Sequence, residues 1–342
     1  MKNFREIDIE GNAHDRGVSH GEQLRSQISD ALIFYRDIFM LSEPELLEQA
    51  AHFQRIITGF SAEYAEEITG IAEGAGQNVL LIVALNARTE ILALNGGAPV
   101  NECTSMCFSD STVLGQTWDW GKPVEDLCSV MRISRPDGHV IRMLAEPGII
   151  GKIGMNSAGV GVCLNILTLG SRLDGVPVHV LLRAILDCKS ATEAAAVINR
   201  APLGKSSNII VADHSGFCFD TEFAGDEMLS PESFKGNFIH TNHYLSKEIN
   251  ALDDPKFFNS RARMNTATKK VSLLTHYSVS TMMDILSDDS HQQFPIYRNY
   301  IYDDILHDVG TVATIVMDLS KLEIHIRKAK YPGNLFTTFS VI

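Results

Sequence analysis

Apolar positions in the first hundred residues follow a helical spacing of three to four residues. Ser42 and Glu45 form the pattern of a capping box, and the stretch 46–60 that follows them carries a helical apolar stripe. The stretch 61–76 repeats this pattern and ends in glycines, which commonly stop a helix. The stretch 78–97 is apolar on most sides, so we predict a helix there that packs into the body of the protein.

The period of the pattern changes to two close to residue 103. This alternation predicts short strands at 103–109, 114–120, 128–134, 139–146, 159–166, 207–213, 216–223 and 236–243. We expect helices at 177–190, 191–202, 256–275 and 279–288, and a final hairpin at 311–329. This order of elements favours an α+β fold of two antiparallel sheets packed face to face with helices outside, which is a four-layer αββα sandwich.

Composition narrows the class of protein further. The chain has 342 residues, of which 45% are hydrophobic, and this is ample for a large core, in one compact globular unit or in two smaller domains. The net charge of −13 argues against a nucleic-acid partner, which requires a basic surface. We find no apolar run that approaches the ~20 residues needed to cross a bilayer, and no signal-peptide pattern. We therefore expect a cytoplasmic protein without a membrane partner.

The six cysteines and the histidines do not form a metal-binding pattern. No C-x-x-C pair occurs, which argues against a zinc ribbon and against a thioredoxin-type motif. His240 and His243 lie on a predicted strand and lack a third partner, so we expect no metal and no cofactor. Most of the cysteines, among them Cys163 and Cys218, are interpreted as buried small apolar residues.

Cys103 stands apart because of the hairpin on which it lies. If Ser109 faces Val113 across a three-residue turn, Cys103 lies opposite Asp119 and shares a face of the sheet with it. A carboxylate raises the pKa of a neighbouring thiol, so this pair suits an ordinary cysteine nucleophile poorly. Cys103 and Asp119 share a face only in this register, since a slip of one residue exchanges the two faces.

The pair makes chemical sense if the chain is cut before Cys103. A free α-amine there has a reference pKa of ~7.7–8.0 and can serve as the base for its own side chain, while Asp119 holds it. The alternative is that Cys103 is a core cysteine at the start of a strand and Asp119 a turn or surface carboxylate.

Several short motifs resemble one family in the right order along the chain. The segment "ECTS…GQTWDW" resembles the start of the mature β-subunit in the isopenicillin-N acyltransferase (acyl-CoA:6-aminopenicillanic acid acyltransferase-like) family of N-terminal-nucleophile (Ntn) cysteine hydrolases. Further similar segments are "HDRGVSHGEQLRSQI" near the N-terminus, "MNSAGVGVCLN" (155–165), "HTNHYL" (240–245), "NSRAR" (259–263) and "FPIYRNY" (294–300). The resemblance implies the Ntn αββα fold, with residues 1–102 as a helical pro-segment, or α-subunit, and residues 103–342 as the catalytic β-subunit.

The resemblance also implies roles for single residues. Cys103 is the expected nucleophile and its freed α-amine the base, which Asp119 orients. Asn242 is expected to donate to the oxyanion and Arg298 to supply positive charge near the thiolate. The remaining substrate or oxyanion candidates are Asn165, Thr104 and Tyr297. Taken alone, Asn242 is equally a turn residue and Arg298 a surface or salt-bridge arginine.

The expected function is that of a self-processing amidase or acyltransferase. It would act on a linear amide, an N-acyl amine or amino-acid conjugate, through an acyl-cysteine intermediate, with an acyl-thioester donor as a further candidate partner. Its own cleaved α-subunit is an expected partner, and a homo-oligomer is left open.

The cleavage site departs from the family pattern. Glu102 precedes the nucleophile where the acyltransferase has glycine, and glutamate lacks glycine's backbone freedom. One alternative is therefore an unprocessed, non-catalytic binding protein of the same fold. A thiol peroxidase that uses Cys103 and Cys107 is a second alternative, although no basic residue lies nearby in sequence.

Overall fold

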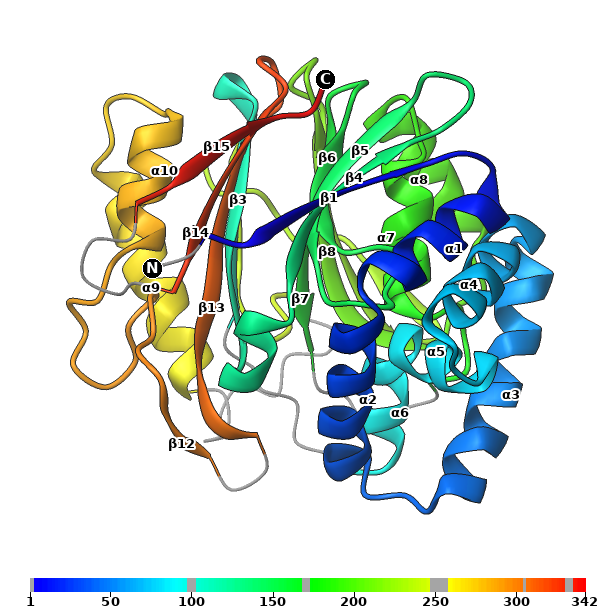
Figure 1. The fold of residues 1–342 in the computed structure, drawn as a ribbon. Coiled ribbons are helices and arrows are strands. Elements are labelled where there is room, and N and C mark those ends of the chain that lie inside the picture. Colours follow the sequence, from blue (N-terminus) through cyan, green and yellow to red (C-terminus); the bar gives the residue numbers. More distant parts are fainter. Residues whose placement is uncertain (1–2, 97–102, 168–172, 247–257, 304–305, 330–334) are drawn as a thin grey trace.

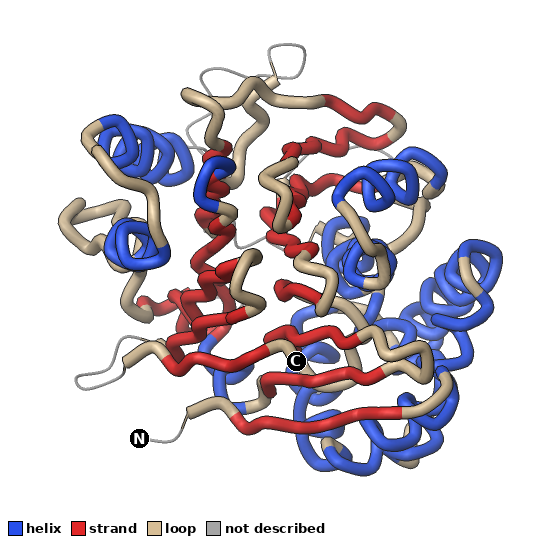
Figure 2. Tube along the Cα trace, turned by 90° about the horizontal axis from the view of Figure 1, so that it is seen from above, coloured by secondary structure: helices blue, strands red, loops and turns tan. Residues whose placement is uncertain are grey.

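Two β-sheets pack face to face between outer layers of helices. A computed structural model describes residues 3–96, 103–167, 173–246, 258–303, 306–329 and 335–342. Figures 1 and 2 show α9 and α10 outside one sheet, and α7, α8 and the N-terminal helices outside the other. The expected four-layer αββα arrangement is therefore confirmed.

The first sheet has eight strands in the order β1-β4-β5-β6-β7-β8-β9-β10. The strands are β1 (Arg5–Glu10), β4 (Ser129–Ser134), β5 (Val140–Ala145), β6 (Ile153–Asn156), β7 (Val160–Ile166), β8 (Lys205–Asp213), β9 (Cys218–Gly225) and β10 (Glu227–Leu229). The second sheet has the order β11-β2-β3-β13-β14-β15, and β12 pairs with β13. These strands are β2 (Thr104–Phe108), β3 (Val113–Gly121), β11 (Phe238–His240), β12 (Ile301–Asp303), β13 (His307–Asp318), β14 (Glu323–Lys328) and β15 (Thr337–Ser340).

The N-terminal segment contributes most of the helices. Its helices are α1 (Ala13–Gln23), α2 (Arg25–Phe39), α3 (Glu43–Phe60), α4 (Ala62–Ala75), α5 (Val79–Asn86) and α6 (Arg88–Leu94). The other helices are α7 (Val178–Leu186), α8 (Ala191–Arg200), α9 (Phe258–Ser272) and α10 (Val279–Leu286). The capping box predicted at the start of α3 is present. The single helix predicted at 78–97 is instead two, because Ala87 leaves helical geometry between α5 and α6.

The N-terminal segment also supplies a strand, which corrects the prediction of a wholly helical segment and of wholly antiparallel sheets. Strand β1 pairs in parallel with β4, from Arg5 opposite Ser129 to Glu10 opposite Ser134. Ile7 and Ile9 of β1 are buried in the main core while the other four residues of the strand are exposed. Six residues with one buried face are thus enough to add the N-terminal segment as an edge strand to the sheet that the rest of the chain builds.

Glycines bring α1 and α4 into close contact. A Cβ atom at Gly17 would lie 2.1 Å from the backbone oxygen of Glu67, and one at Gly74 would lie 2.1 Å from that of Val18. This approach sets Arg16 against Glu67, which also binds Arg183 of α7. The N-terminal helices are therefore tied to the body by buried ion pairs as well as by apolar packing.

The β2–β3 hairpin has a different register from the predicted one. Phe108 lies opposite Val113 and Thr104 opposite Thr117, so each pair is shifted by one residue. The reason is the turn, in which Ser109–Ser111 form a 3-10 helix and Thr112 adopts the left-handed conformation, giving four linking residues instead of three. The shift exchanges the faces, so Asp119 is not the residue that directly opposes Cys103.

Candidate active site

Cys103 lies where β2, β7 and α9 converge. It precedes β2 and is buried, with 5% of its surface exposed. Its carbonyl oxygen accepts hydrogen bonds from Nδ2 of Asn165 at 3.1 Å and from the Arg263 guanidinium at 2.5 Å. Asn165 belongs to β7 of the opposite sheet and Arg263 to α9, so both sheets and an outer helix fix the backbone at Cys103.

Asn165 joins the two sheets beside the thiol. Its carboxamide oxygen accepts a hydrogen bond from the Ser105 hydroxyl, while its nitrogen also reaches the His240 carbonyl oxygen at 3.4 Å. All three residues are fully buried. The predicted convergence of Asn165 with Cys103 is therefore present, and its amide is oriented by contacts on both sides.

Asn242 lies in the loop that follows β11 and is also fully buried. Its Nδ2 donates to the Ile166 carbonyl oxygen at 2.9 Å, and its Oδ1 accepts from Arg263 at 3.0 Å. Its backbone N–H donates to the Ser260 hydroxyl at 2.7 Å. The shared contact with Arg263 links Asn242 to the backbone carbonyl of Cys103, and the oxyanion role of Asn242 stays a prediction.

Arg263 is a residue of this cluster that the sequence reasoning did not single out. It donates to the Cys103 carbonyl oxygen, to the Thr104 hydroxyl at 2.9 Å and to Asn242, and only 1% of it is exposed. Burial lowers its pKa to about 10, although the charges of Asp119 and Cys103 act in the opposite direction. The segment "NSRAR" that contains it resembles a family motif, but nothing in that motif assigns the arginine a place beside the thiol.

Asp119 is an unusual buried carboxylate. It is 1% exposed, and neither of its carboxylate oxygens makes a hydrogen bond among the residues that the structure describes. Burial raises its pKa to about 7, while the nearby Thr311 hydroxyl and the charge of Arg263 lower it. A buried carboxyl without partners is expensive, and groups of this kind are typical of functional sites.

The thiol of Cys103 is protonated at neutral pH in the uncut chain. Burial and the negative charge of Asp119 raise its pKa to about 11. The backbone N–H of Asp119 and the positive charges of Arg263 and Lys152 act to lower this pKa, but they have the smaller effect. The expected unfavourable effect of the carboxylate on the thiol is thus present despite the changed register. Asp119 and Cys103 are neighbours in space although they do not oppose each other across the hairpin.

The remaining candidates have other surroundings. The backbone N–H and carbonyl of Arg298 both bind Thr311, and the guanidinium lies in the field of Asp303. The ring of Tyr297 is buried, with the Arg327 guanidinium 5.4 Å from its centroid. Glu102 lies outside the described residues. The roles of Arg298 and Tyr297 therefore stay predictions. The arginine that contacts Cys103 in the structure is Arg263.

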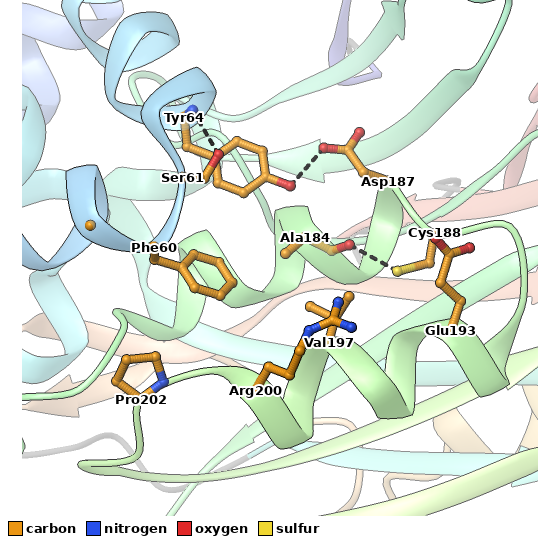
Figure 3. Close-up of a pocket in the computed structure, with 11 residues that line it drawn as sticks. Phe60, Ser61, Tyr64, Ala184, Asp187, Cys188, Glu193, Val197, Arg200 and Pro202 are labelled. Atoms are coloured by element: carbon orange, nitrogen blue, oxygen red, sulfur yellow. Dashed lines mark hydrogen bonds between the residues drawn. The ribbon is translucent and has the colours of Figure 1, made fainter.

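A cavity of about 510 Å³ lies elsewhere in the molecule. Figure 3 shows it between the α3–α4 junction, with Phe60 and Tyr64, and the α7–α8 region, with Asp187, Val197 and Arg200. Its lining includes no residue of the cluster around Cys103. The cavity is therefore a feature of the contact between the N-terminal helices and the body.

Two further observations concern metals and membranes. The described part of the chain holds no group of three or more His, Cys, Asp or Glu side chains that is arranged to bind a metal ion. Within the same part, none of the helices has the length and apolar character needed to span a bilayer.

Comparisons with known proteins identify the family of this chain. The family model "Acyl-coenzyme A:6-aminopenicillanic acid acyl-transferase" matches residues 107–330. The chain is 31% identical over 263 residues to the acyl-coenzyme A:6-aminopenicillanic-acid-acyltransferase 40 kDa form of Emericella nidulans, covering 72% of this chain and 73% of that protein. The chain therefore belongs to the acyl-coenzyme A:6-aminopenicillanic acid acyltransferase family, and it is an enzyme of the acyltransferase and amidase type.

Similar solved structures share the fold only loosely. A variant of the conjugated bile acid hydrolase from Clostridium perfringens has a TM-score of 0.49 at 11% identity, covering 70% of this chain and 92% of that one. An N-acylethanolamine-hydrolyzing acid amidase ortholog from Caenorhabditis elegans has a TM-score of 0.46 at 18% identity, covering 64% and 93%. Because both TM-scores are below 0.5, neither likeness supports an argument about the site.

Proposed function

We propose that this chain is the precursor of a self-processing amidase or acyltransferase that is cut between Glu102 and Cys103. The observation that carries the proposal is Asp119, a buried carboxylate without a hydrogen-bond partner among the described residues and close enough to Cys103 to raise the pKa of its thiol. Cleavage would create an α-amine at Cys103, which becomes an ammonium when it takes the thiol proton. That cation would be a partner for Asp119 that the uncut chain lacks.

The cleavage step balances as an acyl shift followed by hydrolysis. The Cys103 sulfur attacks the carbonyl carbon of Glu102, the C–N bond breaks, and the departing nitrogen takes the thiol proton. The product is a thioester between the Glu102 acyl group and the sulfur. Water then hydrolyses the thioester, which frees the thiol and leaves a carboxylate at Glu102.

The mature site would use the same groups for an external amide. The freed α-amine of Cys103 takes the thiol proton, and the sulfur attacks the substrate carbonyl carbon to form a tetrahedral intermediate. Asn242 is the proposed donor to its oxyanion, a contact of a kind typically worth ~2.7–4 kcal/mol. Arg263 keeps the Cys103 carbonyl and the Asn242 carboxamide in their relative positions. The amine then leaves with a proton, and water or a second amine accepts the acyl group.

The proposed substrate is a linear amide, an N-acyl amine or an amino-acid conjugate. The family description supports acyl transfer, and the relative from Emericella nidulans is named for an acyl-coenzyme A donor and 6-aminopenicillanic acid. An acyl thioester is therefore a proposed donor for this chain as well.

Intact mass measurement with N-terminal sequencing tests the proposal. The wild-type chain should yield one fragment that ends at Glu102 and one that begins at Cys103. Cys103→Ala should remain full length, while the matched variant Cys163→Ala, which changes a buried cysteine of β7, should still be cut. A wild-type chain that stays intact and hydrolyses no amide or thioester would favour the unprocessed binding protein.

A further inference from the structure

The loop that carries Asn242 is held along its middle by side-chain hydrogen bonds of Thr241, Asn242 and Tyr244. Residues 241–246 lie after β11 and outside any helix or strand. On one side, α9 holds the middle of the loop, through the hydroxyl of Ser260 and the guanidinium of Arg263. A donor that stabilises a transition state must be held within ~0.5 Å of its productive position, so the ends of this loop require anchors too.

Glu222 of β9 contacts both ends of the loop. At the start of the loop, its Oε1 is 2.8 Å from Nε2 of His240, the last residue of β11. At the far end, its two carboxylate oxygens accept the backbone N–H groups of Leu245 at 2.5 Å and of Ser246 at 3.1 Å. A single carboxylate therefore closes the loop on which Asn242 lies.

The charge state of this pair agrees with the geometry. Burial opposes a charge on His240, but Asp220 and Glu222 outweigh it and raise the His240 pKa. The second ring nitrogen, Nδ1, is 2.7 Å from the Thr241 carbonyl oxygen, so a protonated ring donates at both nitrogens. Burial also opposes a charge on Glu222 and so acts to raise its pKa. The hydrogen bonds from His240, Ser246 and Leu245 act in the other direction and lower that pKa overall.

We propose that Glu222 is a positioning residue for the reaction at Cys103, because it fixes both ends of the 240–246 loop and thereby the carboxamide of Asn242. Glu222 itself contacts neither Cys103 nor Asn242 in the described hydrogen bonds, so it acts through the loop. This inference rests on the function proposed above, in which Asn242 donates to the oxyanion.

The test is a double-mutant cycle of Glu222→Gln and Asn242→Ala. Glutamine places an NH2 group against N–H donors and cannot accept all three bonds, so the loop should loosen without loss of the fold. With p-nitrophenyl acyl esters as the probe, Glu222→Gln should lower kcat about 10- to 100-fold with KM changed less than twofold. Asn242→Ala should lower kcat about 10²- to 10³-fold, and the double variant should be no slower than Asn242→Ala alone.

Controls separate this role from a general structural one. Glu227→Gln changes an exposed glutamate on the adjacent strand β10 and should leave kcat and KM unchanged. If Glu222→Gln does not fold, Glu222→Asp replaces it in the same cycle, since it keeps both oxygens but withdraws them by one methylene.

The outcomes are distinct. Wild-type kcat in Glu222→Gln, or multiplicative losses in the double variant, would overturn the positioning role and leave the proposed function intact. Undiminished kcat in Asn242→Ala would instead remove the oxyanion assignment, and the positioning role with it. Intact mass of each variant shows whether processing has occurred, so that a failure to mature is not mistaken for slow turnover.

Discussion

Glu67 and Asp119 are both buried carboxylates, yet their surroundings are opposite. Glu67, 2% exposed, accepts hydrogen bonds from Arg16 and Arg183 at 2.7–3.1 Å, and these arginines lower its pKa although burial acts to raise it. Asp119, 1% exposed, has no hydrogen bond among the described residues, and burial raises its pKa to about 7. The paired carboxylate stabilises the contact between the N-terminal helices and the body, whereas the unpaired one lies beside Cys103, the proposed nucleophile.

The largest expected effect is that of Asp119→Asn on maturation and turnover. The substitution keeps the shape of the side chain but cannot pair with the proposed ammonium of Cys103. The yield of cut chain, or kcat of the fraction that is cut, should fall about 10²- to 10⁴-fold, the range typical of acid–base groups. Intact mass and a p-nitrophenyl ester assay measure the two effects. Activity equal to that of the wild type would show that Asp119 does not serve the nucleophile.

Glu67→Gln should destabilise the chain strongly without touching the site. It leaves two buried arginines without their counter-ion, and the loss of one partner of a buried pair typically costs about 3–5 kcal/mol. Urea unfolding in a Cys103→Ala background, where the chain stays in one piece, measures this cost. The exposed neighbour Glu66→Gln is the matched control and should change the free energy of unfolding by less than about 0.5 kcal/mol.

Asp119→Asn should have the opposite influence on stability, with a defined pH dependence. Because the folded-state pKa of Asp119 is raised to about 7 from its ordinary value of 3.8, its contribution to stability is complete below pH 3.8 and is lost as pH rises toward 7. In the Cys103→Ala background, Asp119→Asn should therefore become more stable relative to its parent between pH 4 and pH 7, by about 1.4 kcal/mol per pKa unit. Urea unfolding at both pH values measures the difference, and a constant difference would contradict the raised pKa.

The smallest effect is expected at an exposed ion pair of the N-terminal helices. Arg36 and Glu43 are 3.8 Å apart, and their side chains are 46% and 59% exposed. Glu43→Gln should change the free energy of unfolding by less than about 1 kcal/mol, and less at high salt. This measurement sets the scale against which the cost at Glu67 is judged. A loss of stability as large as that of Glu67→Gln would mean that the burial of Glu67 does not explain the cost of its substitution.

Much of the fold follows from local patterns in the sequence. The start of α3 was predictable because Ser42 and Glu45 act within one turn of a helix. Most strands of the β-rich part were predictable from their alternation, although the short strands β6, β10, β12 and β15 were missed. Strand β1 was also missed, because its partner β4 lies more than a hundred residues away and six alternating residues alone do not reveal it.

The candidate site was predictable in composition but not in detail. Cys103 and Asp119 are neighbours as expected, but the register was wrong by one residue because a 3-10 helix at Ser109–Ser111 lengthened the turn. Arg263 reaches Cys103 from 160 positions further along the chain. No local pattern encodes such a contact, since it depends on how α9 packs against the second sheet.

Strand β1 changes what a cut at residue 103 would mean for the protein. Because β1 lies hydrogen-bonded in the sheet next to β4, the two products of cleavage would share one sheet and one core. Folding of the uncut precursor is a first-order process, whereas recovery of the denatured mature enzyme would require two separate chains to meet and would depend on their concentration. Maturation would thus convert a protein that can refold alone into one whose lifetime is set by how slowly it comes apart.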